Sequence, residues 1–216
     1  MEDLKAKLAS PELSDRLSAV GTLRTLAAQE AIPLLEQAIQ DTSARVRYAA
    51  VSLLGQMGDL QQRETMISLL NTDPEFDVRA AAAAALGDLK DPEAIDALVT
   101  AYERDSEWLV RFSIVAALGE IAHPRAFDLL VEALDSEPLT RTVAAGALGQ
   151  MGDLRAVPLL IKYANDEDWQ LRFRVAQSLG QLGTSEAVEA LEKLIHDPIE
   201  QVAEVAREAL ALGLKK

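Results

Sequence analysis

The sequence predicts an all-α fold, an α-solenoid of about seven stacked helix pairs, because a 31-residue repeat runs along it. A Leu-Gly pair recurs through the 216 residues, with its glycines 32, 32, 30 and 31 residues apart. An arginine stands eight residues before each of these glycines, and an aspartate stands six residues before each arginine. The apolar residues between these markers follow the three- and four-residue spacing of amphipathic helices. Self-similarity at such a period is typical of a chain built from stacked repeats.

Five copies of the repeat contain all three markers. The glycines are Gly55, Gly87, Gly119, Gly149 and Gly180, the arginines are Arg47, Arg79, Arg111, Arg141 and Arg172, and the aspartates are Asp41, Asp73, Asp105, Asp135 and Asp166. One period earlier the same register falls on Ser10 and Arg16, and one period later it falls on Asp197 and Ala203. Seven copies therefore account for the chain, and we expect a single solenoid over residues 1–216 without an internal domain boundary.

Each copy is predicted to form one longer and one shorter helix. The longer helices are expected over Thr42–Met57, Pro74–Leu89 and Asp168–Leu182 in three of the copies. The shorter helices contain Pro33 or Pro158 in two copies, and proline is tolerated in a first helical turn, where its missing N–H has no partner to lose. A helix pair of this size cannot bury its apolar face alone, so neighbouring copies must stack.

The two terminal copies differ from the others in a way that suits exposed ends. Asp15 stands in the first copy at the core position that is Val46 in the second. The last long helix presents Glu204, Arg207 and Glu208 instead of an apolar face. Both changes place charge where no further copy covers the surface, as terminal capping repeats require.

Composition excludes several classes of function. The chain has 35 acidic and 21 basic residues, a net charge of −14, and no cysteine. Nucleic acids and anionic lipids select a basic face, and without cysteine there is no disulfide, thiolate nucleophile or thioether-linked cofactor. The N-terminus lacks the basic and apolar regions of a secretory signal, and no apolar stretch reaches about 18 residues. We expect a soluble, cytoplasmic protein with no metal, no membrane insertion and no nucleic-acid partner.

The recurrent charged and glycine residues are interpreted as scaffold. Each aspartate is expected to cap its own long helix, since Asp is a preferred N-cap, while each arginine reaches the aspartate of an adjacent copy. Glycine inside a helix costs about 1 kcal/mol relative to alanine, so its recurrence indicates close approach of two backbones. His123 occupies a turn position that is aspartate in other copies, and His196 ends a short helix. The chain has no metal-binding or nucleophile motif, so the catalytic residues, if any, are unknown.

One face of the long helices is not explained by packing. It lies opposite the buried face that contains Val46 and Ala50, and it bears both tryptophans in a chain with only 4% aromatic residues. Its aromatic residues are Tyr48, Phe76, Trp108, Phe112, Trp169 and Phe173, which we call the aromatic face. Trp and Tyr are enriched at interface hot spots, so a partner or a planar ligand is expected there. The alternative is that the rings only cover gaps between neighbouring long helices.

The D-x5-R-x6-L-G spacing and the helix pattern E-A-I-x-x-L resemble the HEAT-like repeats of the phycobilisome bilin lyase-like family. Within that family, the segments 46–52, 106–114, 156–163 and 168–175 are similar to the cyanobacterial phycobilisome-degradation proteins. The resemblance extends over nearly the whole chain. It implies a factor that acts in photosynthetic cyanobacteria when the light-harvesting antenna is dismantled during nutrient starvation. Its partners would be phycocyanin and allophycocyanin.

The resemblance also implies transient contact with a phycocyanobilin-type bilin of the client, whose detachment the protein would promote. Related lyases usually act as heterodimers of two such solenoids, whereas this chain is one solenoid. Two alternatives stay open at this point. One is a non-catalytic scaffold for protein–protein interaction, for instance with an A-type iron–sulfur carrier, whose cluster this cysteine-free chain could not hold. The other is an engineered binder, which the divergence between the copies disfavours.

Overall fold

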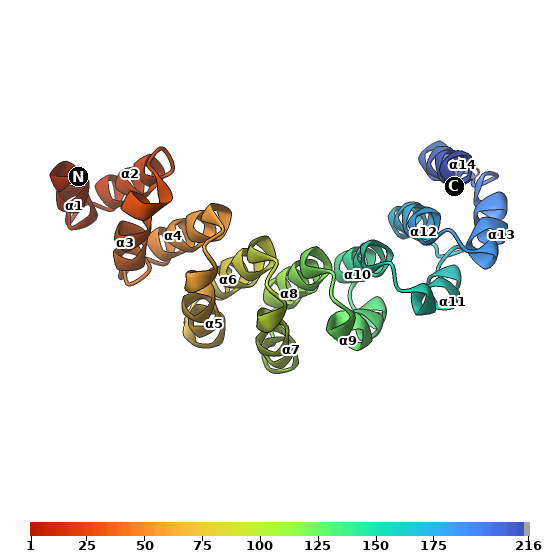
Figure 1. Cartoon of the computed structure of the whole chain (residues 1–216), viewed down its shortest axis with the longest axis horizontal. Helices are drawn as coiled ribbons and strands as arrows, with labels where there is room; N and C mark the ends of the chain where they lie inside the picture. The colour runs from red at the N-terminus through yellow and green to blue at the C-terminus, as the bar shows by residue number, and fades with distance from the viewer. Residues whose placement is uncertain (214–216) are drawn as a thin grey trace. The chain divides into compact units, whose positions relative to one another are not determined.

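The structure is a computed structural model that describes residues 1–213, and within that range it contains helices and no strand. Helix follows helix in antiparallel pairs, as the coloured ribbon of Figure 1 shows. The predicted all-α solenoid is therefore confirmed. By its internal contacts the chain divides into two compact units, unit 1 over Met1–Ala117 and unit 2 over Leu118–Lys216, which are described separately.

In unit 1 the long helices α2, α4 and α6 stack side by side, and the shorter helices α3 and α5 pack beside them. Its elements are α1 (Glu2–Leu8), α2 (Leu13–Leu23), α3 (Ala28–Ala38), α4 (Ala44–Met57), the 3₁₀ turn η1 (Leu60–Gln62), α5 (Arg63–Thr72), α6 (Phe76–Leu89), η2 (Pro92–Ala94), α7 (Ile95–Arg104) and the greater part of α8 (Trp108–Ile121).

In unit 2 the long helices α10, α12 and α14 stack in the same manner, with α9, α11 and α13 beside them. Its elements after α8 are η3 (Pro124–Ala126), α9 (Phe127–Glu132), η4 (Ala133–Asp135), α10 (Pro138–Met151), η5 (Leu154–Ala156), α11 (Val157–Ile161), α12 (Trp169–Leu182), α13 (Ser185–Leu194) and α14 (Glu200–Gly213).

The core of each unit lies between its long and short helices. Val46, Ala50 and Leu54 of α4 are fully buried, as the helical spacing of these residues predicts. The repeat glycines bring neighbouring long helices together: a Cβ at Gly55 would lie 2.6 Å from the Cβ of Ala85 on α6. The other four repeat glycines meet the next long helix at similar distances. Close backbone approach, inferred from the sequence, is thus the reason for the repeated glycine.

The long helices begin one or two residues later than predicted, and the repeat aspartates are not their N-caps. Helix α4 starts at Ala44 with Ser43 as N-cap, and α6 starts at Phe76 with Glu75 as N-cap. The carboxylate of Asp41 instead accepts a hydrogen bond from the backbone N–H of Ser43 at 2.7 Å. This turn, closed by an aspartate side chain two residues before the helix, directs the chain into the helix without belonging to it.

The prediction for proline is correct at one position and wrong at the other. Pro158 stands in the first turn of α11. Pro33 lies inside α3, whose first residue is Ala28. Here the residues that form a 3₁₀ turn in later copies continue directly into the α-helix, so Pro33 removes one backbone hydrogen bond from the middle of the helix.

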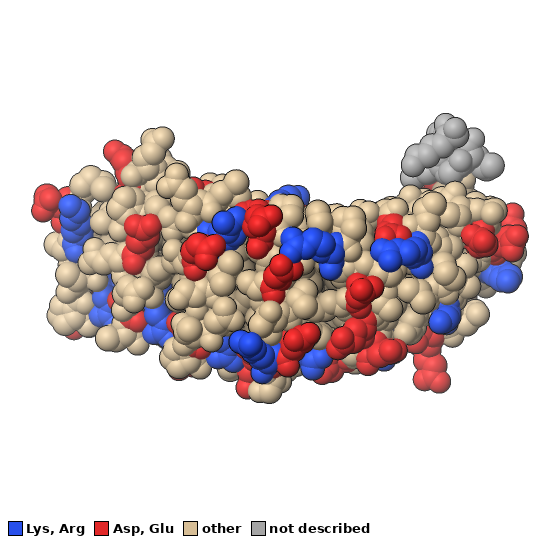
Figure 2. Space-filling view, turned by 60° about the horizontal axis from the view of Figure 1, so that its bottom comes forward, with Lys and Arg blue, Asp and Glu red and all other residues tan. Residues whose placement is uncertain are grey.

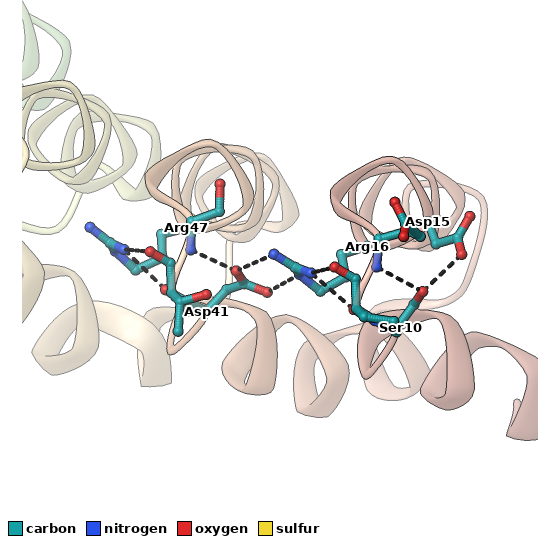
Figure 3. A network of polar contacts seen from close by, with 9 residues as sticks. Ser10, Asp15, Arg16, Asp41 and Arg47 are labelled. Carbon is teal, nitrogen blue, oxygen red and sulfur yellow. Dashed lines mark hydrogen bonds and ion pairs between the residues drawn. The ribbon is translucent and has the colours of Figure 1, made fainter.

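The ends of the chain bear charge, as predicted for capping copies. Asp15 on α2 is exposed and accepts a hydrogen bond from the hydroxyl of Ser10 at 2.8 Å (Figure 3). On α14, Glu204, Arg207 and Glu208 are exposed. None of the helices within residues 1–213 combines the length and the apolar character needed to cross a membrane.

Candidate functional site

The repeat arginines and aspartates join successive copies into a ladder. The Arg47 guanidinium donates to both carboxylate oxygens of Asp73, through Nε at 2.8 Å and Nη2 at 2.9 Å. Its remaining nitrogen, Nη1, donates to the backbone carbonyl of Asp41 at 3.0 Å. Figure 3 shows the preceding rung, in which Arg16 holds Asp41. The predicted reach from one copy to the next is confirmed by hydrogen bonds for Arg16, Arg47, Arg79 and Arg172, whose guanidinium groups are engaged in the scaffold.

The electrostatics of the ladder are those of a structural ion pair. Burial by itself would raise the pKa of Asp73, whose side chain is only 3% exposed. The hydrogen bonds from Arg47 and from the backbone N–H of Glu75 outweigh burial and hold the pKa of this carboxyl below its ordinary value. The same donors from Arg79 and Glu107 lower the pKa of Asp105. Carboxyls held ionised in this way are unsuited to act as general acids.

The ladder is less regular around the fourth and fifth copies. Arg111 stacks its guanidinium on the Tyr102 ring, 4.3 Å from the ring centroid. In unit 2 the Asp135 carboxylate accepts a hydrogen bond from the Tyr163 hydroxyl at 3.1 Å. The nearest atoms of Arg141 and Asp166 are 3.8 Å apart, beyond hydrogen-bonding distance.

His123 is a turn residue at the start of η3. Its Nδ1 accepts a hydrogen bond from the backbone N–H of Arg125 at 3.3 Å, at the start of η3. Asp91 has the same role at the start of η2, where its carboxylate accepts from the N–H of Glu93. Within residues 1–213, no group of three or more His, Cys, Asp or Glu side chains is arranged to hold a metal ion.

The aromatic face is exposed where the sequence predicts it. Trp108 is 51% exposed, Tyr48 49%, Trp169 41% and Phe76 39%. Phe112 and Phe173 are partly buried. Trp108, Phe76 and Trp169 are the first residues of α8, α6 and α12, so their rings lie at the N-terminal ends of long helices.

The two predicted tryptophan–phenylalanine pairs differ. Trp108 and Phe112 make an edge contact, with ring centroids 6.4 Å apart and planes inclined by 65°. Trp169 and Phe173 make no ring contact in the described part of the chain. The ring pair expected at both places is thus present in unit 1 and absent among the described residues of unit 2.

A groove of about 510 Å³ opens on this face of unit 1, across α4, α6 and α8. Its floor is formed by alanines of α6, which project no side chain beyond Cβ, and Tyr48 lines it from α4. The lining residues are Ala44, Arg45, Tyr48, Ser52, Asp77, Ala80, Ala81, Ala84, Leu109 and Ser113. The structure thus brings Tyr48 to an apolar groove that sequence reasoning did not identify. The run of alanines in α6 was its only signal.

On the face drawn in Figure 2 the charged side chains are mixed. On the surface drawn in Figure 2, red acidic and blue basic side chains are interspersed and neither sign forms a continuous patch. This mixture agrees with a scaffold in which charges pair along the repeat. The aromatic face and its groove are therefore the candidate binding site.

Comparison with proteins of known structure places the fold among helical-repeat proteins. The complex of CpcE and CpcF of phycocyanin lyase from a Nostoc species matches 96% of this chain and 92% of that one, with a TM-score of 0.63 and 24% identity. The Escherichia coli protein YibA matches 97% of this chain and 92% of its own, with a TM-score of 0.61 and 17% identity. At these identities the likeness extends to the fold alone.

Among curated sequences, deoxyhypusine hydroxylase from Homo sapiens is 33% identical over 78 residues, which are 35% of this chain and 26% of that protein. The enzyme from Mus musculus is 35% identical over 81 residues, 37% of this chain and 26% of its own length. The chain thus matches about a quarter of the length of these relatives. The family model for HEAT repeats matches residues 1–87, 63–145 and 135–211. Since those matches extend over nearly every copy of the repeat, and the helix pairs stack as such repeats do, the chain belongs to the HEAT-repeat family.

Proposed function

We propose that this protein is a phycobilisome disassembly factor of the NblB type, which binds phycobiliproteins and promotes detachment of their bilin during nutrient starvation. The observation that carries the proposal is the exposed aromatic face. Rings that served only to fill gaps between neighbouring long helices would be largely buried. Instead Trp108 and Tyr48 leave about half of their surface open to solvent, as residues at interface hot spots do before a partner binds.

The groove in unit 1 offers suitable chemistry for a tetrapyrrole attached to a client. The Tyr48 ring and the alanines of α6 present an apolar surface to a planar chromophore, and Arg45 among the lining residues supplies a cation for a propionate. Detachment is the reverse of thiol addition. The bond between the client's cysteine sulfur and the bilin carbon breaks, the adjacent carbon loses a proton, and the sulfur leaves as a thiol. Because this chain has no cysteine, it cannot trap the released bilin through a new thioether.

The fold of the phycocyanin lyase complex is compatible with the proposal, although the similarity concerns the fold alone. The phycocyanin lyase complex shares the helical-repeat architecture over most of this chain. The sequence segments that resemble phycobilisome-degradation proteins include Tyr48, Trp108 and Trp169. The sequence resemblance suggests phycocyanin and allophycocyanin as clients in the cytoplasm, and the fold is compatible with that proposal.

The test is to mix the protein with purified phycocyanin or allophycocyanin and to follow both complex formation and the visible absorbance. We expect co-elution on gel filtration and a loss of chromophore absorbance that the Trp108→Ala variant abolishes. A change of Leu154→Ala, at an exposed apolar residue outside the aromatic face, is the matched control and should leave both signals intact. Unchanged absorbance together with no complex would refute the proposal.

A non-catalytic scaffold is the second candidate, and the lining of the groove favours it. Asp77 is the only carboxylate among the lining residues, and they include no histidine. A groove with so few proton-transfer groups is better equipped to bind than to catalyse. Complex formation without any spectral change would identify a scaffold or adaptor, for which an A-type iron–sulfur carrier is the second client to test.

A further inference from the structure

The chain contains nine aromatic residues, and they divide into two groups by their neighbours. Six form the aromatic face. The other three, Tyr102, Phe127 and Tyr163, each lie beneath an arginine of the chain itself. The guanidinium carbons of Arg111, Arg155 and Arg141 lie 4.3, 4.0 and 6.0 Å from the respective ring centroids. Every aromatic ring outside the aromatic face is thus paired with an arginine.

No arginine of the described chain lies over a ring of the aromatic face in this way. An exposed aromatic ring attracts a cation through its negative face, and arginine is the side chain most often found there. The exposed rings of unit 1 therefore have no arginine of the chain over them, and a large part of their surface is accessible to a cation from outside it. This holds for Tyr48, Phe76 and Trp108, the three exposed rings of that unit.

The carboxylates around these rings favour the same kind of ligand. Glu75 and Asp77 flank Phe76, and Glu107 precedes Trp108; all three are exposed. Asp77 also lines the groove, opposite its one lining cation, Arg45. The groove itself is lined by one carboxylate and one cation, and Glu75 and Glu107 add two exposed carboxylates next in sequence to Phe76 and Trp108, where a guanidinium could pair with them.

The shape of the groove suits a helix. The groove is lined by Tyr48 on α4, by Ala80 and Ala84 on α6, and by Leu109 and Ser113 on α8, so small side chains form its middle. Helix axes pack about 8–10 Å apart, which places α4 and α8 about 16–20 Å from each other on either side of α6. An α-helix with its side chains is about 10–12 Å across. A single helix therefore fits along the alanines of α6, between the two outer long helices.

We propose that the groove of unit 1 docks an arginine-bearing α-helix of a partner protein. Its small or apolar side chains pack on Ala80 and Ala84, and its guanidinium groups lie over the open rings and pair with Asp77 and Glu107. Arg45 takes a carboxylate, or the C-terminal carbonyls, of the docked helix. This inference names the chemistry of the partner in the proposed function, but it does not depend on that partner being a phycobiliprotein.

The test uses a defined probe, a fluorescently labelled helical peptide of about 18 residues rich in alanine and leucine, with three arginines at four-residue spacing. A matched peptide has citrulline, which is neutral and nearly isosteric, in place of each arginine. Binding to the full-length protein is followed by fluorescence anisotropy. We expect the citrulline peptide to bind at least about tenfold more weakly, and the arginine peptide to lose affinity as salt rises from about 50 to about 500 mM.

Two variants locate the site. Ala84→Leu fills the groove and should weaken binding about tenfold or more. The same enlargement at Ser68→Leu, an exposed residue of α5, is the matched control and should have no effect. Should Ala84→Leu fail to fold, Asp77→Asn decides, since it removes an exposed carboxylate and adds no volume.

Equal binding of the two peptides, or undiminished binding to both Ala84→Leu and Asp77→Asn, would overturn the inference. So would a failure of the arginine peptide to bind at about 1 mM. The proposed function is judged separately. A phycocyanin complex together with no binding of the arginine peptide refutes the docked helix alone, whereas peptide binding without any phycocyanin complex refutes the client alone.

Discussion

Replacing Gly55 with alanine tests whether the repeat glycine exists for close helix packing. This residue lies in the last turn of α4, directly against α6. A Cβ added there would lie 2.6 Å from the Cβ and 2.7 Å from the Cα of Ala85. Because Ala85 Cα is backbone, no side-chain rotation can relieve the contact, and the two helices must move apart.

The expected magnitude follows from two opposing contributions. Alanine stabilises a helix interior by about 1 kcal/mol relative to glycine. Ordinary carbon–carbon contact is about 3.5–4.0 Å, so the added methyl group overlaps Ala85 by about 1 Å. Overpacking of this kind costs about 1–3 kcal/mol, and separating α4 from α6 also forfeits part of their dispersion contacts. We expect a net loss of about 2 kcal/mol, or a decrease in Tm of about 4–8 °C.

Gly21 provides the matched control. It lies in α2, is exposed, and has no heavy atom within 4 Å of an added Cβ. The same substitution there brings the gain in helix propensity without the clash. Gly21→Ala should therefore stabilise the protein by about 0.5–1 kcal/mol.

The assay is thermal and urea denaturation, followed by circular dichroism at 222 nm, on the wild type and the two variants. The informative quantity is the difference between them, because helix propensity contributes equally to both. If Gly55→Ala were as stable as Gly21→Ala, steric contact would not be the reason for the repeated glycine, and the packing of α4 on α6 described above would be wrong.

Three further predictions concern the ladder and the aromatic face. Arg47→Ala leaves the buried Asp73 without its partner and should cost about 3 kcal/mol of unfolding free energy in urea melts. The control Lys7→Ala, from an exposed ion pair, should change the unfolding free energy by less than about 0.5 kcal/mol. A smaller effect at Arg47 than at Lys7 would contradict a stabilising role for the ladder. The pKa of Asp73 is lowered in the fold, so the stability that this carboxyl contributes is complete above its ordinary pKa of 3.8 and is lost as the pH falls below 3.8. Urea midpoints measured downward from about pH 5 should therefore decrease only below about that pH. A decrease that begins well above pH 3.8 would point to other groups. Trp108→Ala should cost only about 1 kcal/mol of stability, which is the value of its ring pair with Phe112. The same variant should weaken client binding more than about tenfold. A large stability loss with intact binding would show that the ring serves packing.

Most of the scaffold could be predicted because the same residue types recur at equivalent positions in several copies of the repeat. Glycine at Gly55 and its equivalents is costly in a helix, so its recurrence identified a close approach before any coordinates were known. The helix starts were less accurate. The aspartate at Asp41 closes a turn two residues before Ser43 instead of capping the helix, and both arrangements suit the same residue type. Pro33 lies inside α3 although the equivalent register of a later copy begins a helix, since that boundary depends on the preceding turn.

The exposure of the aromatic face was predictable from helical spacing, but the groove beside it was not. Tyr48, Ala80 and Phe112 occupy the same position of three copies, and a sequence shows only that alanine is small. Whether the gap beside it is filled depends on how far apart α4 and α8 lie, and that is a property of stacking. The pairing of Arg111 with Tyr102 escaped prediction for the same reason, because the two residues come from different helices.

The positions that stacking requires and the positions that a partner requires must therefore be separate in this chain. Gly55 and its four equivalents are constrained, because at each of them the next long helix approaches within 3 Å of an added Cβ. The position of Tyr48 can vary, because it faces away from the core, and it changes from tyrosine to alanine to phenylalanine over three successive copies. An array of identical copies would present either a continuous row of rings or a continuous row of alanines, and neither would make a groove. Specific binding thus depends on the difference between neighbouring copies: Ala80 is only 5% exposed and leaves no room for a ring, so a copy with tyrosine at this position, like that of α4, could not take its place without repacking α6.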